Sequence, residues 1–324
     1  MTSRSSSARA PRLLFLSVLL LALAPSPAFA GPACAASGWP RGTPTTLVLS
    51  GGGAKGAYEA GVAAELLEHG VTIRLVAGSS AGALNAAMIA DGRLDRLETL
   101  WRGLTGARVY SLRPSVFFAG LLPGWLTLLT LDHAGSLFDP APLRELIDAS
   151  LDLDRIRASP VRLLVVTTDL ARREPRFFDN RTLTREALMA AAAVPGAFPA
   201  VAVDGTLLVD GGLTGRAPVL EALAADPHVE RAVVVMSYAT DERGSPPTTM
   251  RRALEEAFEM GMIHQIRRDV ELARLKFPTV ELHLLTPSAP LSLRPLDFDP
   301  AAIARALERG RADAAACLSG WETR

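Results

Sequence analysis

The chain has 324 residues, of which 49% are hydrophobic and 21% charged, a composition typical of a globular protein with one large domain or at most two. Basic and acidic residues balance at 34 each, and no basic patch stands out. This balance argues against a function in nucleic-acid binding, which relies on clustered positive charge.

The first thirty residues differ from the rest of the chain. Three arginines precede the apolar run Leu13 to Ala24, and Ala28 and Ala30 supply the small residues that an export peptidase recognises. The run is too short to span a bilayer comfortably, and prolines follow it, which disfavours a membrane anchor. We therefore expect a signal peptide over residues 1–30 and an exported protein, periplasmic or secreted, after cleavage near Ala30.

The two cysteines, Cys34 and Cys317, stand near the two ends of the mature chain. An oxidising compartment allows them to pair, and the sequence leaves both a disulfide and two independent thiols open. Lipid anchoring through Cys34 is not expected, because Gly31 stands where the attachment signal requires an aliphatic residue.

The mature chain opens with alternating strands and helices. Thr45 to Ser50 is predicted to form a short buried strand that ends in the glycine loop Gly51 to Gly56. A helix follows and closes near Gly70. A second strand, Ile73 to Ala77, leads into Gly78-Ser-Ser-Ala-Gly82 and an alanine-rich helix. This order predicts a parallel sheet.

The glycine loop does not fit a nucleotide-binding site. A dinucleotide fingerprint requires an acidic residue about twenty positions later, where the chain reads Thr72 to Leu75, and a Walker loop requires Ser or Thr at position 56, which is glycine. Glycines at a helix N-terminus can instead present backbone N–H groups to the oxyanion of an acyl-transfer intermediate. The candidate oxyanion-binding residues are Gly51, Gly52, Gly53, Ala54, Lys55 and Gly56.

The sequence from Gly78 to Gly82 fits the pattern G-x-S-x-G of a nucleophile elbow, a strained turn between a strand and a helix. Ser80 is then the candidate nucleophile, and the two glycines let the strand and the helix pack closely around it. The alternative is an ordinary helix start made of small residues and capped by Ser79 or Ser80.

The most apolar stretch of the mature chain runs from Val116 to Leu131. Glycines and a proline interrupt it, so a continuous transmembrane helix is not expected. Two interpretations stay open, ordinary core on the one hand and, on the other, a hydrophobic lip or acyl channel at the mouth of the site. Under the second, the candidate acyl-binding residues are Phe117, Phe118 and Trp125.

The remaining elements again alternate. Helices are predicted over residues 94–104, 139–147, 185–193, 250–275 and 300–316, and strands over 161–168, 201–203, 207–209, 232–236 and 280–285. The strand at 207–209 ends in Asp210-Gly-Gly212, where a carboxylate can meet a serine from another strand. Asp-Gly is also a common turn dipeptide, so alone it indicates only a turn.

The glycine loop, the elbow and Asp210-Gly-Gly212 resemble, in order and in spacing, the three signature blocks of patatin-like phospholipases. Residues 136–143 and 192–199 are similar to linking segments of that family, so the resemblance covers about residues 46–235. It implies an α/β fold of three layers, α/β/α, with a mainly parallel central sheet. A single hydrolase domain is then expected over residues 31–324, with 236–324 as a C-terminal extension packed on it.

By motif position, the resemblance implies that Ser80 is the nucleophile and Asp210 its base, without a histidine. Members of the family generally need no metal, no ligand cluster in the sequence indicates one, and no cofactor or nucleotide is expected. The implied substrate is a lipid or phospholipid, with contact to a membrane surface. One departure is Arg216, which stands where the family commonly has an asparagine.

Two alternatives belong to other classes of protein. A Ser-Asp-His α/β-hydrolase would use His228, His264 or His283, which follow Asp210 in the required order, but such a fold normally builds several strands before the elbow's own. A catalytically silent domain would bind a lipid or a partner through residues 116–131, and Arg216 is the sequence feature in its favour.

Overall fold

The computed structural model describes residues 42–119, 122, 126, 127, 133, 135–239 and 246–322. The predicted signal peptide, Cys34 and Trp125 lie outside these ranges. Cys317 is buried and disulfide-bonded. No helix in the described ranges is both long enough and apolar enough to cross a membrane.

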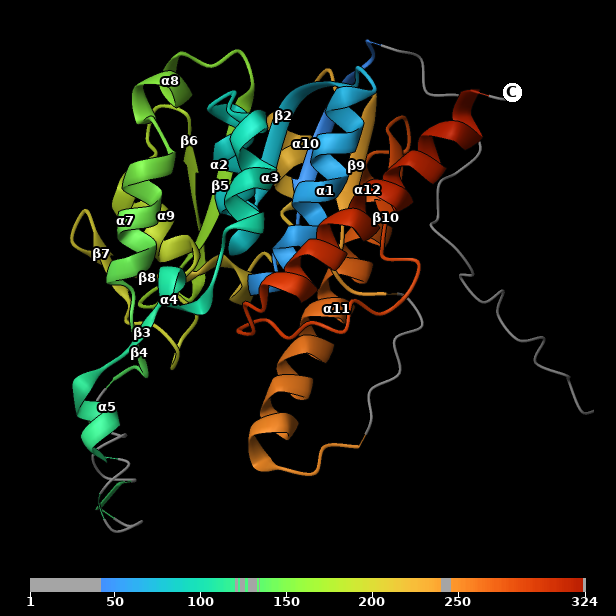
Figure 1. Ribbon diagram of the computed structural model, residues 1–324. Coiled ribbons are helices and arrows are strands. Elements are labelled where there is room, and N and C mark those ends of the chain that lie inside the picture. The colour runs from blue at the N-terminus through green and yellow to red at the C-terminus, as the bar shows by residue number, and fades with distance from the viewer. Residues whose placement is uncertain are drawn as a thin grey trace, which may run out of the picture.

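Within the described residues, a mixed eight-stranded sheet forms the centre of the molecule (Figure 1). Its strands are β1 (Pro44–Leu49), β2 (Thr72–Gly78), β5 (Arg162–Asp169), β6 (Glu174–Asp179), β7 (Val201–Val203), β8 (Thr206–Asp210), β9 (Arg231–Val235) and β10 (Glu281–Leu285). The strand order is β10-β9-β1-β2-β5-β8-β7, with β6 also paired to β5. The pairs from β10 to β5 are parallel, whereas β6, β8 and β7 join by antiparallel pairing.

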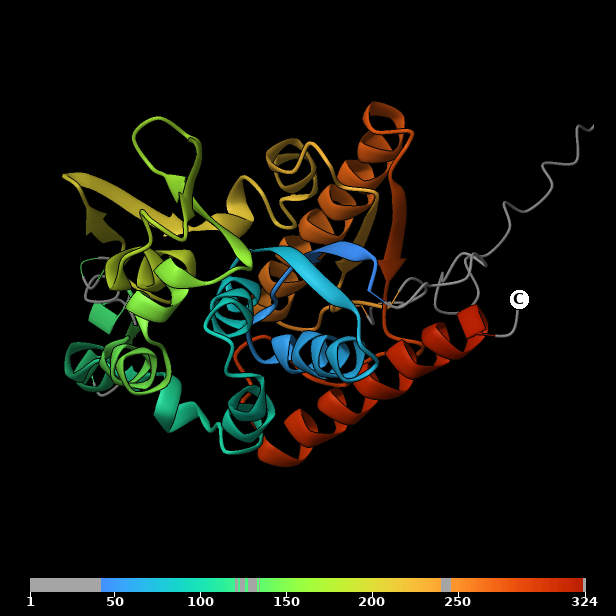
Figure 2. The same cartoon turned by 90° about the horizontal axis from the view of Figure 1, so that it is seen from above.

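Helices cover both faces of the sheet (Figure 2). The first face carries α1 (Gly56–Glu68), α2 (Ala81–Ala90), α3 (Leu94–Arg102), α7 (Ala141–Ser150), α8 (Leu153–Ala158), α9 (Arg185–Ala191) and α12 (Pro300–Glu322), and the second carries α10 (Val219–Ala225) and α11 (Met250–Lys276). Side chains alternate along each strand, so Leu47 and Leu49 enter the first core and Val48 the second. The expected three-layer α/β/α fold is confirmed.

Several short elements connect these layers. They are α4 (Gly106–Val109), β3 (Ser111–Leu112), α5 (Pro114–Ala119), β4 (Phe138–Asp139) and the 3₁₀ turns η1 (Gly53–Lys55) and η2 (Gly211–Leu213). The strands expected at 45–50, 73–77 and 161–168 occur as β1, β2 and β5, and the expected hairpin occurs as β7 and β8. β6 was not predicted, because three of its six residues are charged and only Phe178 in it is buried.

β2 and β8 approach each other end to end along one edge of β5. β2 pairs with Arg162–Val165 of that strand and β8 with Thr167–Asp169, while β6 occupies the opposite edge over Leu164–Asp169. Because β2 runs parallel and β8 antiparallel to β5, their C-terminal ends meet near Val166. The residues that follow β2 therefore lie next to the last residue of β8.

α12 crosses α1 at close range through two glycines. A Cβ atom on Gly61 would lie 2.1 Å from the carbonyl oxygen of Leu307, and one on Gly310 would lie 2.2 Å from that of Tyr58. Neither position can carry a side chain unless the backbones move apart. The C-terminal helix is thus fitted directly onto the helix that follows the glycine loop.

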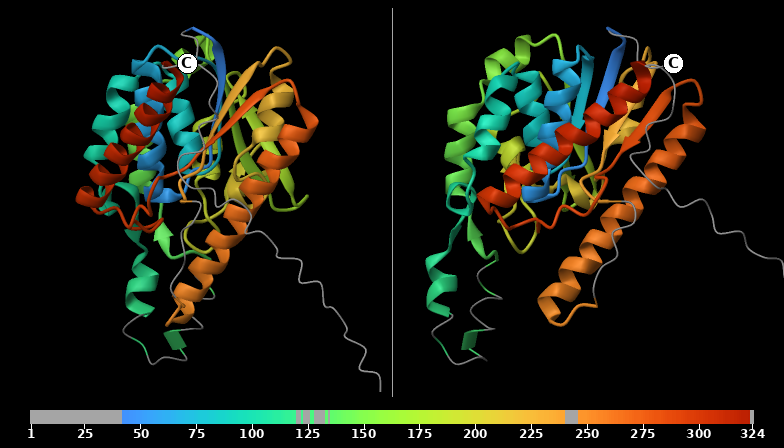
Figure 3. Two further views of the ribbon diagram at one scale, coloured as in Figure 1. Left: turned by 90° about the vertical axis from the view of Figure 1, so that its right-hand side faces the viewer. Right: turned by 45° about the vertical axis from the view of Figure 1, so that its right-hand side comes forward.

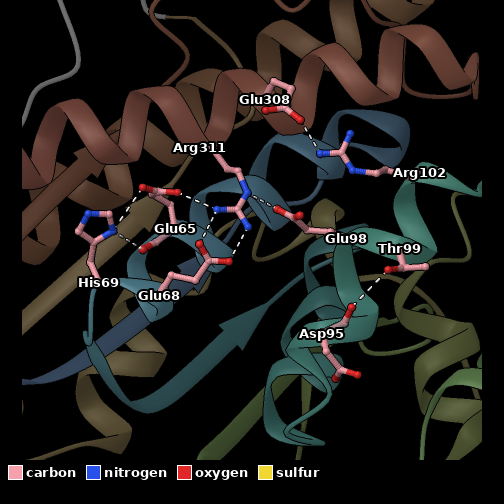
Figure 4. A network of polar contacts seen from close by, with 9 residues as sticks. All are labelled: Glu65, Glu68, His69, Asp95, Glu98, Thr99, Arg102, Glu308 and Arg311. Atoms are coloured by element: carbon pink, nitrogen blue, oxygen red, sulfur yellow. Dashed lines mark hydrogen bonds and ion pairs between the residues drawn. The ribbon is translucent and has the colours of Figure 1, made fainter.

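Arg311 joins this crossing to a third helix (Figure 4). Its guanidinium donates hydrogen bonds to Glu65 and Glu68 of α1 and to Glu98 of α3. The side chains of Arg311, Glu65 and Glu98 are only 22%, 13% and 20% exposed, so these ion pairs are shielded from solvent. Such a network contributes more than an isolated surface pair.

Replacing Arg311 with methionine should lower the free energy of unfolding by about 2 kcal/mol, because two partly buried glutamates lose their shared cation. Urea denaturation at pH 7 measures this loss. Arg305, exposed on the same helix, provides the control, and its methionine variant should differ from wild type by less than about 0.5 kcal/mol.

The pH dependence of that loss gives a second check. The Arg311 hydrogen bond lowers the pKa of Glu68, so this contribution is present above the ordinary pKa of glutamate and is lost as pH falls through the lowered value. A deficit in the Arg311 variant that stays constant from pH 7 to pH 3 would contradict the ion-pair explanation.

Candidate active site

Ser80 lies between β2 and α2 in a backbone conformation that L-residues rarely adopt, with φ 55° and ψ −132°. Such strain is typical of a nucleophile turn. A Cβ atom on Gly78 would lie 2.3 Å from the carbonyl oxygen of Gly82, and one on Gly82 would lie 2.5 Å from that of Leu49. Both glycines are therefore required for this turn, for the steric reason that the motif predicts.

The glycine loop packs directly on the elbow. Gly51 has φ 75°, and a Cβ atom there would lie 2.4 Å from the carbonyl oxygen of Ser79. Gly53 has φ 58°, and a Cβ atom there would lie 2.0 Å from the carbonyl oxygen of Pro295. This fit brings Gly52 and Gly53 to the same cavity as the serine of the elbow.

Most of the loop N–H groups are already used within the protein. The N–H of Gly51 donates to Glu59 Oε1 at 2.7 Å, and the N–H of Ala54 donates to the carbonyl oxygen of Pro295 at 2.8 Å. The N–H of Lys55 donates to the carbonyl oxygen of Gly52 at 3.2 Å, and the N–H of Gly56 donates to those of Gly53 and Ala54. Gly52 and Gly53 donate no backbone hydrogen bond in the described part of the chain, and both line the cavity. Of the six residues predicted to bind the oxyanion, Gly52 and Gly53 are therefore the two whose backbone N–H groups remain available to a ligand.

Ala81 joins them as a donor that the sequence analysis did not name. It is the first residue of α2 and lines the cavity beside Ser80. The first N–H groups of a helix have no acceptor within the helix, so this one is available to a ligand. Its place directly after the serine is the signal that could have identified it, because that N–H is a standard donor of an elbow site.

Lys55 is a buried, ion-paired residue and not a free cation in the cavity. Its side chain is 4% exposed, and Nζ lies 3.2 Å from Oε2 of Glu259 on α11. The ammonium group also lies 4.0 Å from the centroid of the Tyr238 ring. Lys55 therefore ties the glycine loop to α11.

Asp210 is the last residue of β8 and is 2% exposed. Its Oδ1 accepts the N–H of Gly212 at 2.7 Å, and its backbone oxygen accepts the Thr168 hydroxyl at 2.9 Å. Burial raises the pKa of Asp210, and the Arg216 guanidinium, the Gly212 N–H and hydrogen bonding by Ser80 lower it in part. Oδ2 makes no hydrogen bond of ordinary geometry in the described residues, so the contact with Ser80 is a loose one, as is common in catalytic pairs without substrate.

A cavity of about 1300 Å³ opens beside Ser80. That volume exceeds the usual range of small-molecule pockets, roughly 300–1,000 Å³. Its walls come mainly from α2, α3, α7, α11 and the loops before β7 and α12, with apolar side chains that include Leu84, Met88, Leu97, Trp101, Leu143, Leu146, Ile147, Phe198, Met262 and Phe298. The space suits a long apolar group whose reactive end lies at the serine.

The predicted acyl-binding residues Phe117 and Phe118 do not line this cavity. α5, which carries them, extends away from the sheet, and the two side chains are 57% and 62% exposed (Figure 3). Trp125, the third residue of that prediction, lies outside the described residues. Phe117 and Phe118 thus do not form an acyl channel in this cavity, because helices from distant parts of the chain enclose it; a role for them as a lip at its mouth stays a prediction.

The histidines do not supply a third catalytic group in the described residues. None of His228, His264 and His283 lines the cavity with Ser80. His283 lies inside β10, with Nε2 3.1 Å from Glu281, and two strands separate β10 from β2. The geometry gives no support to the Ser-Asp-His alternative.

Comparison with known proteins agrees with the motif order. A family model described as patatin-like phospholipase matches residues 47–223, which is 177 of the 324 residues. An uncharacterized NTE family protein of Mycobacterium bovis is 32% identical over 173 residues, which cover 53% of this chain and 43% of that protein. A cGAMP-activated phospholipase of Pseudomonas aeruginosa is 31% identical over 195 residues, which cover 55% of each chain.

The chain thus spans about half the length of these relatives. Among solved structures, VipD from Legionella pneumophila aligns with a TM-score of 0.44 and 16% identity, over 87% of this chain and 67% of that one.

Glu59, in the first turn of α1, accepts hydrogen bonds at the start of the glycine loop. Its Oε1 accepts the Gly51 N–H at 2.7 Å and the Ser50 hydroxyl at 3.0 Å. Complete burial raises the pKa of Glu59 to about 7, although these hydrogen bonds and the Arg216 guanidinium act to lower it. A carboxyl group that titrates near neutral pH therefore lies beneath the site.

Replacing Glu59 with glutamine should change how stability depends on pH. The unfolded chain ionises this group near pH 4.3, whereas the folded protein keeps the proton to about pH 7, so wild type loses stability relative to Glu59→Gln as pH rises through that window. We expect the difference in unfolding free energy to move by about 3 kcal/mol between pH 4 and pH 8. Urea denaturation across this range measures it.

Glu271, exposed on α11, provides the matched control, and its glutamine variant should follow the wild-type pH dependence. If the difference between wild type and Glu59→Gln did not vary with pH, the buried, protonated carboxyl group would be ruled out.

Proposed function

As the chain belongs to the patatin-like phospholipase family, we propose that it is a serine acyl hydrolase that cleaves fatty-acyl ester bonds of phospholipids or other lipids. The observation that carries this proposal is the strained Ser80, next to the Asp210 carboxylate, at the wall of a large apolar cavity. Nucleophile, base and a space for an acyl chain meet at one place.

In the first half of the reaction, Ser80 Oγ attacks the ester carbonyl carbon while its proton passes to the Asp210 carboxylate. Burial raises the pKa of Asp210, which makes it a better base than an exposed aspartate. The carbonyl electrons move to the oxygen, which accepts hydrogen bonds from the N–H groups of Gly52, Gly53 and Ala81, each contributing on the order of 3 kcal/mol. The bond to the alcohol then breaks, and Asp210 returns the proton to the leaving oxygen.

In the second half, water attacks the acyl group on Ser80. The Asp210 carboxylate accepts a proton from that water, the same backbone donors bind the second oxyanion, and the ester bond to Ser80 breaks. The proton returns to the serine oxygen, and a fatty acid leaves.

The cavity supports a lipid as substrate. Each methylene group that moves from water into an apolar wall contributes about 0.8 kcal/mol, and this cavity has room for a long chain. The names of the relatives, which include a phospholipase and a neuropathy target esterase of Drosophila persimilis, are consistent with this substrate class.

Contact with a membrane surface belongs to the same proposal. α5 and the N-terminal part of α11 extend from the same side of the molecule (Figure 3). They carry exposed apolar side chains, with Phe117, Phe118, Met250 and Met260 between 57% and 81% exposed. Met250 also lines the cavity, so this surface adjoins the opening through which a lipid would enter.

Ser80→Ala and Asp210→Asn should each reduce ester hydrolysis by a factor of 10³ or more (order of magnitude), because nucleophile and base act as one unit. Hydrolysis of p-nitrophenyl butyrate by the purified protein measures this. His228→Ala and His264→Ala, which alter groups outside the cavity, serve as controls and should retain wild-type rates. Near-normal activity in either dyad variant would refute the assignment, and an inactive wild type would favour the silent lipid-binding domain.

Leu146→Trp should shorten the cavity and select against long chains. Leu146 lines the cavity from α7. Displacing about two methylene groups costs about 1.6 kcal/mol, which is roughly a fifteenfold loss in kcat/KM for a palmitoyl ester. Activity on a butyrate ester should stay within about twofold.

The double variant Phe117→Ser/Phe118→Ser is the matched comparison for that test. It should lower activity on phospholipid vesicles and leave soluble palmitoyl and butyrate esters unaffected, because these side chains lie outside the cavity. Equal losses on short and long soluble esters in Leu146→Trp, without a change in Tm, would argue against the acyl-binding role of the cavity.

A further inference from the structure

Arg216 is a buried cation in the wall of the proposed active site. Its side chain follows η2, is 2% exposed, and lines the same cavity as Ser80, Gly52 and Gly53. The absent side chain of Gly212 leaves the room for it, since a Cβ atom there would lie 2.7 Å from Nη1 of Arg216. The guanidinium is therefore built into the site.

The guanidinium lies between the proposed base and the proposed oxyanion donors. The Cβ position of Gly212 lies 2.7 Å from Nη1 and 2.9 Å from Oδ1 of Asp210, which places these two groups close together. On the other side, Nη2 lies 3.5 Å from the Cβ position of Gly52. The same cation thus adjoins both places where negative charge resides during acyl transfer.

Its hydrogen-bonding capacity is unused. A guanidinium carries five N–H donors, but in the described part of the chain Arg216 donates no hydrogen bond, and its Nε is buried without an acceptor. Asp210 and Glu59 interact with it electrostatically only. Buried N–H donors without acceptors cost folding free energy. Their presence in the wall of a site indicates that a bound ligand supplies the acceptor atoms.

We propose that Arg216 is a further catalytic residue, which donates hydrogen bonds to the negatively charged oxygen of the tetrahedral intermediate. As Ser80 attacks, the O–H bond of the serine breaks and its proton joins Asp210, so the negative charge passes from the carboxylate to the former carbonyl oxygen. A guanidinium next to both groups stabilises the charge before and after the transfer. The inference rests on the proposed hydrolase function.

The charged groups around Arg216 come from several elements. Asp210 of β8 and Glu59 of α1 face it, and Lys55, the cation of the glycine loop, is paired with Glu259 of α11. Because Arg216 lowers the pKa of Asp210, its removal should move the acid limb of the pH–rate profile to higher pH. Measurements of rate must therefore be made on the pH-independent plateau.

The test compares Arg216→Met, Arg216→Gln and Arg216→Lys with wild type on p-nitrophenyl butyrate and on a phosphatidylcholine. We expect Arg216→Met to lower kcat by about a hundredfold on both substrates with KM within about twofold, the loss typical of one missing oxyanion donor. Arg216→Lys should retain more activity than Arg216→Gln, because it keeps the charge. Inhibition by an alkyl trifluoromethyl ketone, whose serine adduct carries the same oxyanion, should weaken in parallel with kcat/KM.

Arg176→Met is the matched control. Its guanidinium pairs with Asp204 and stacks on Phe178 outside the cavity, so kcat, KM and the pH profile should not change. If Arg216→Met does not fold, the comparison of the lysine and glutamine variants carries the same test.

Three results would overturn the inference. A loss confined to the phosphatidylcholine would assign Arg216 to the headgroup phosphate. A lower Tm with unchanged kcat would make its role structural. Unchanged inhibitor affinity alongside a reduced kcat would show that Arg216 does not bind the oxyanion. If the wild-type protein hydrolyses no ester, the proposed hydrolase function itself is wrong. If wild type is active and the Arg216 variants are equally active, only the role of Arg216 is wrong.

Discussion

The structure depends on one backbone contact, the close packing of the glycine loop on the turn that carries Ser80. Gly51 meets the backbone of Ser79, and Gly82 meets the end of β1, at separations that exclude any side chain. Two loops that follow neighbouring parallel strands are thereby held as a single rigid unit. Because an oxyanion site must be arranged before substrate arrives, this rigidity is the physical basis of the proposed catalysis.

The position of Asp210 follows from sheet topology rather than from this contact. β8 and β2 run in opposite directions along the same edge of β5, so the C-terminal ends of the two strands meet. The Asp210 carboxylate at one end is thereby placed next to the turn that carries Ser80 at the other. The antiparallel part of the sheet, formed by β6, β8 and β7, is what distinguishes this arrangement from a purely parallel one.

Sequence patterns predicted those parts of the site that backbone geometry dictates. The tight contacts of the glycine loop, the strained turn at Ser80 and the strand end at Asp210 were all expected, because glycines at tight contacts and a carboxylate at a strand end leave local signals, while their catalytic roles stay predictions. The cavity left none, since its walls combine α2, α3, α7 and α11, whose contacts depend on tertiary packing. For the same reason the apolar residues of α5 indicated an acyl channel, although Phe117 and Phe118 are exposed. Apolarity in the sequence does not distinguish a surface that meets a lipid from a cavity that holds one.

The buried charges complete the account of the site. Lys55 and Glu259 neutralise each other, and the buried guanidinium of Arg216 faces two buried carboxyl groups, those of Asp210 and Glu59. A single cation cannot balance two buried anions, and the raised pKa of Glu59, about 7, resolves this by keeping that group protonated below neutral pH. In that state the charges of Asp210 and Arg216 balance. In the proposed reaction, Asp210 becomes neutral as it accepts the serine proton, while an equal negative charge develops on the substrate oxygen. Above neutral pH, ionised Glu59 adds a second negative charge behind the glycine loop, so the proton on Glu59 is electrostatically linked to any negative charge that develops in the proposed site.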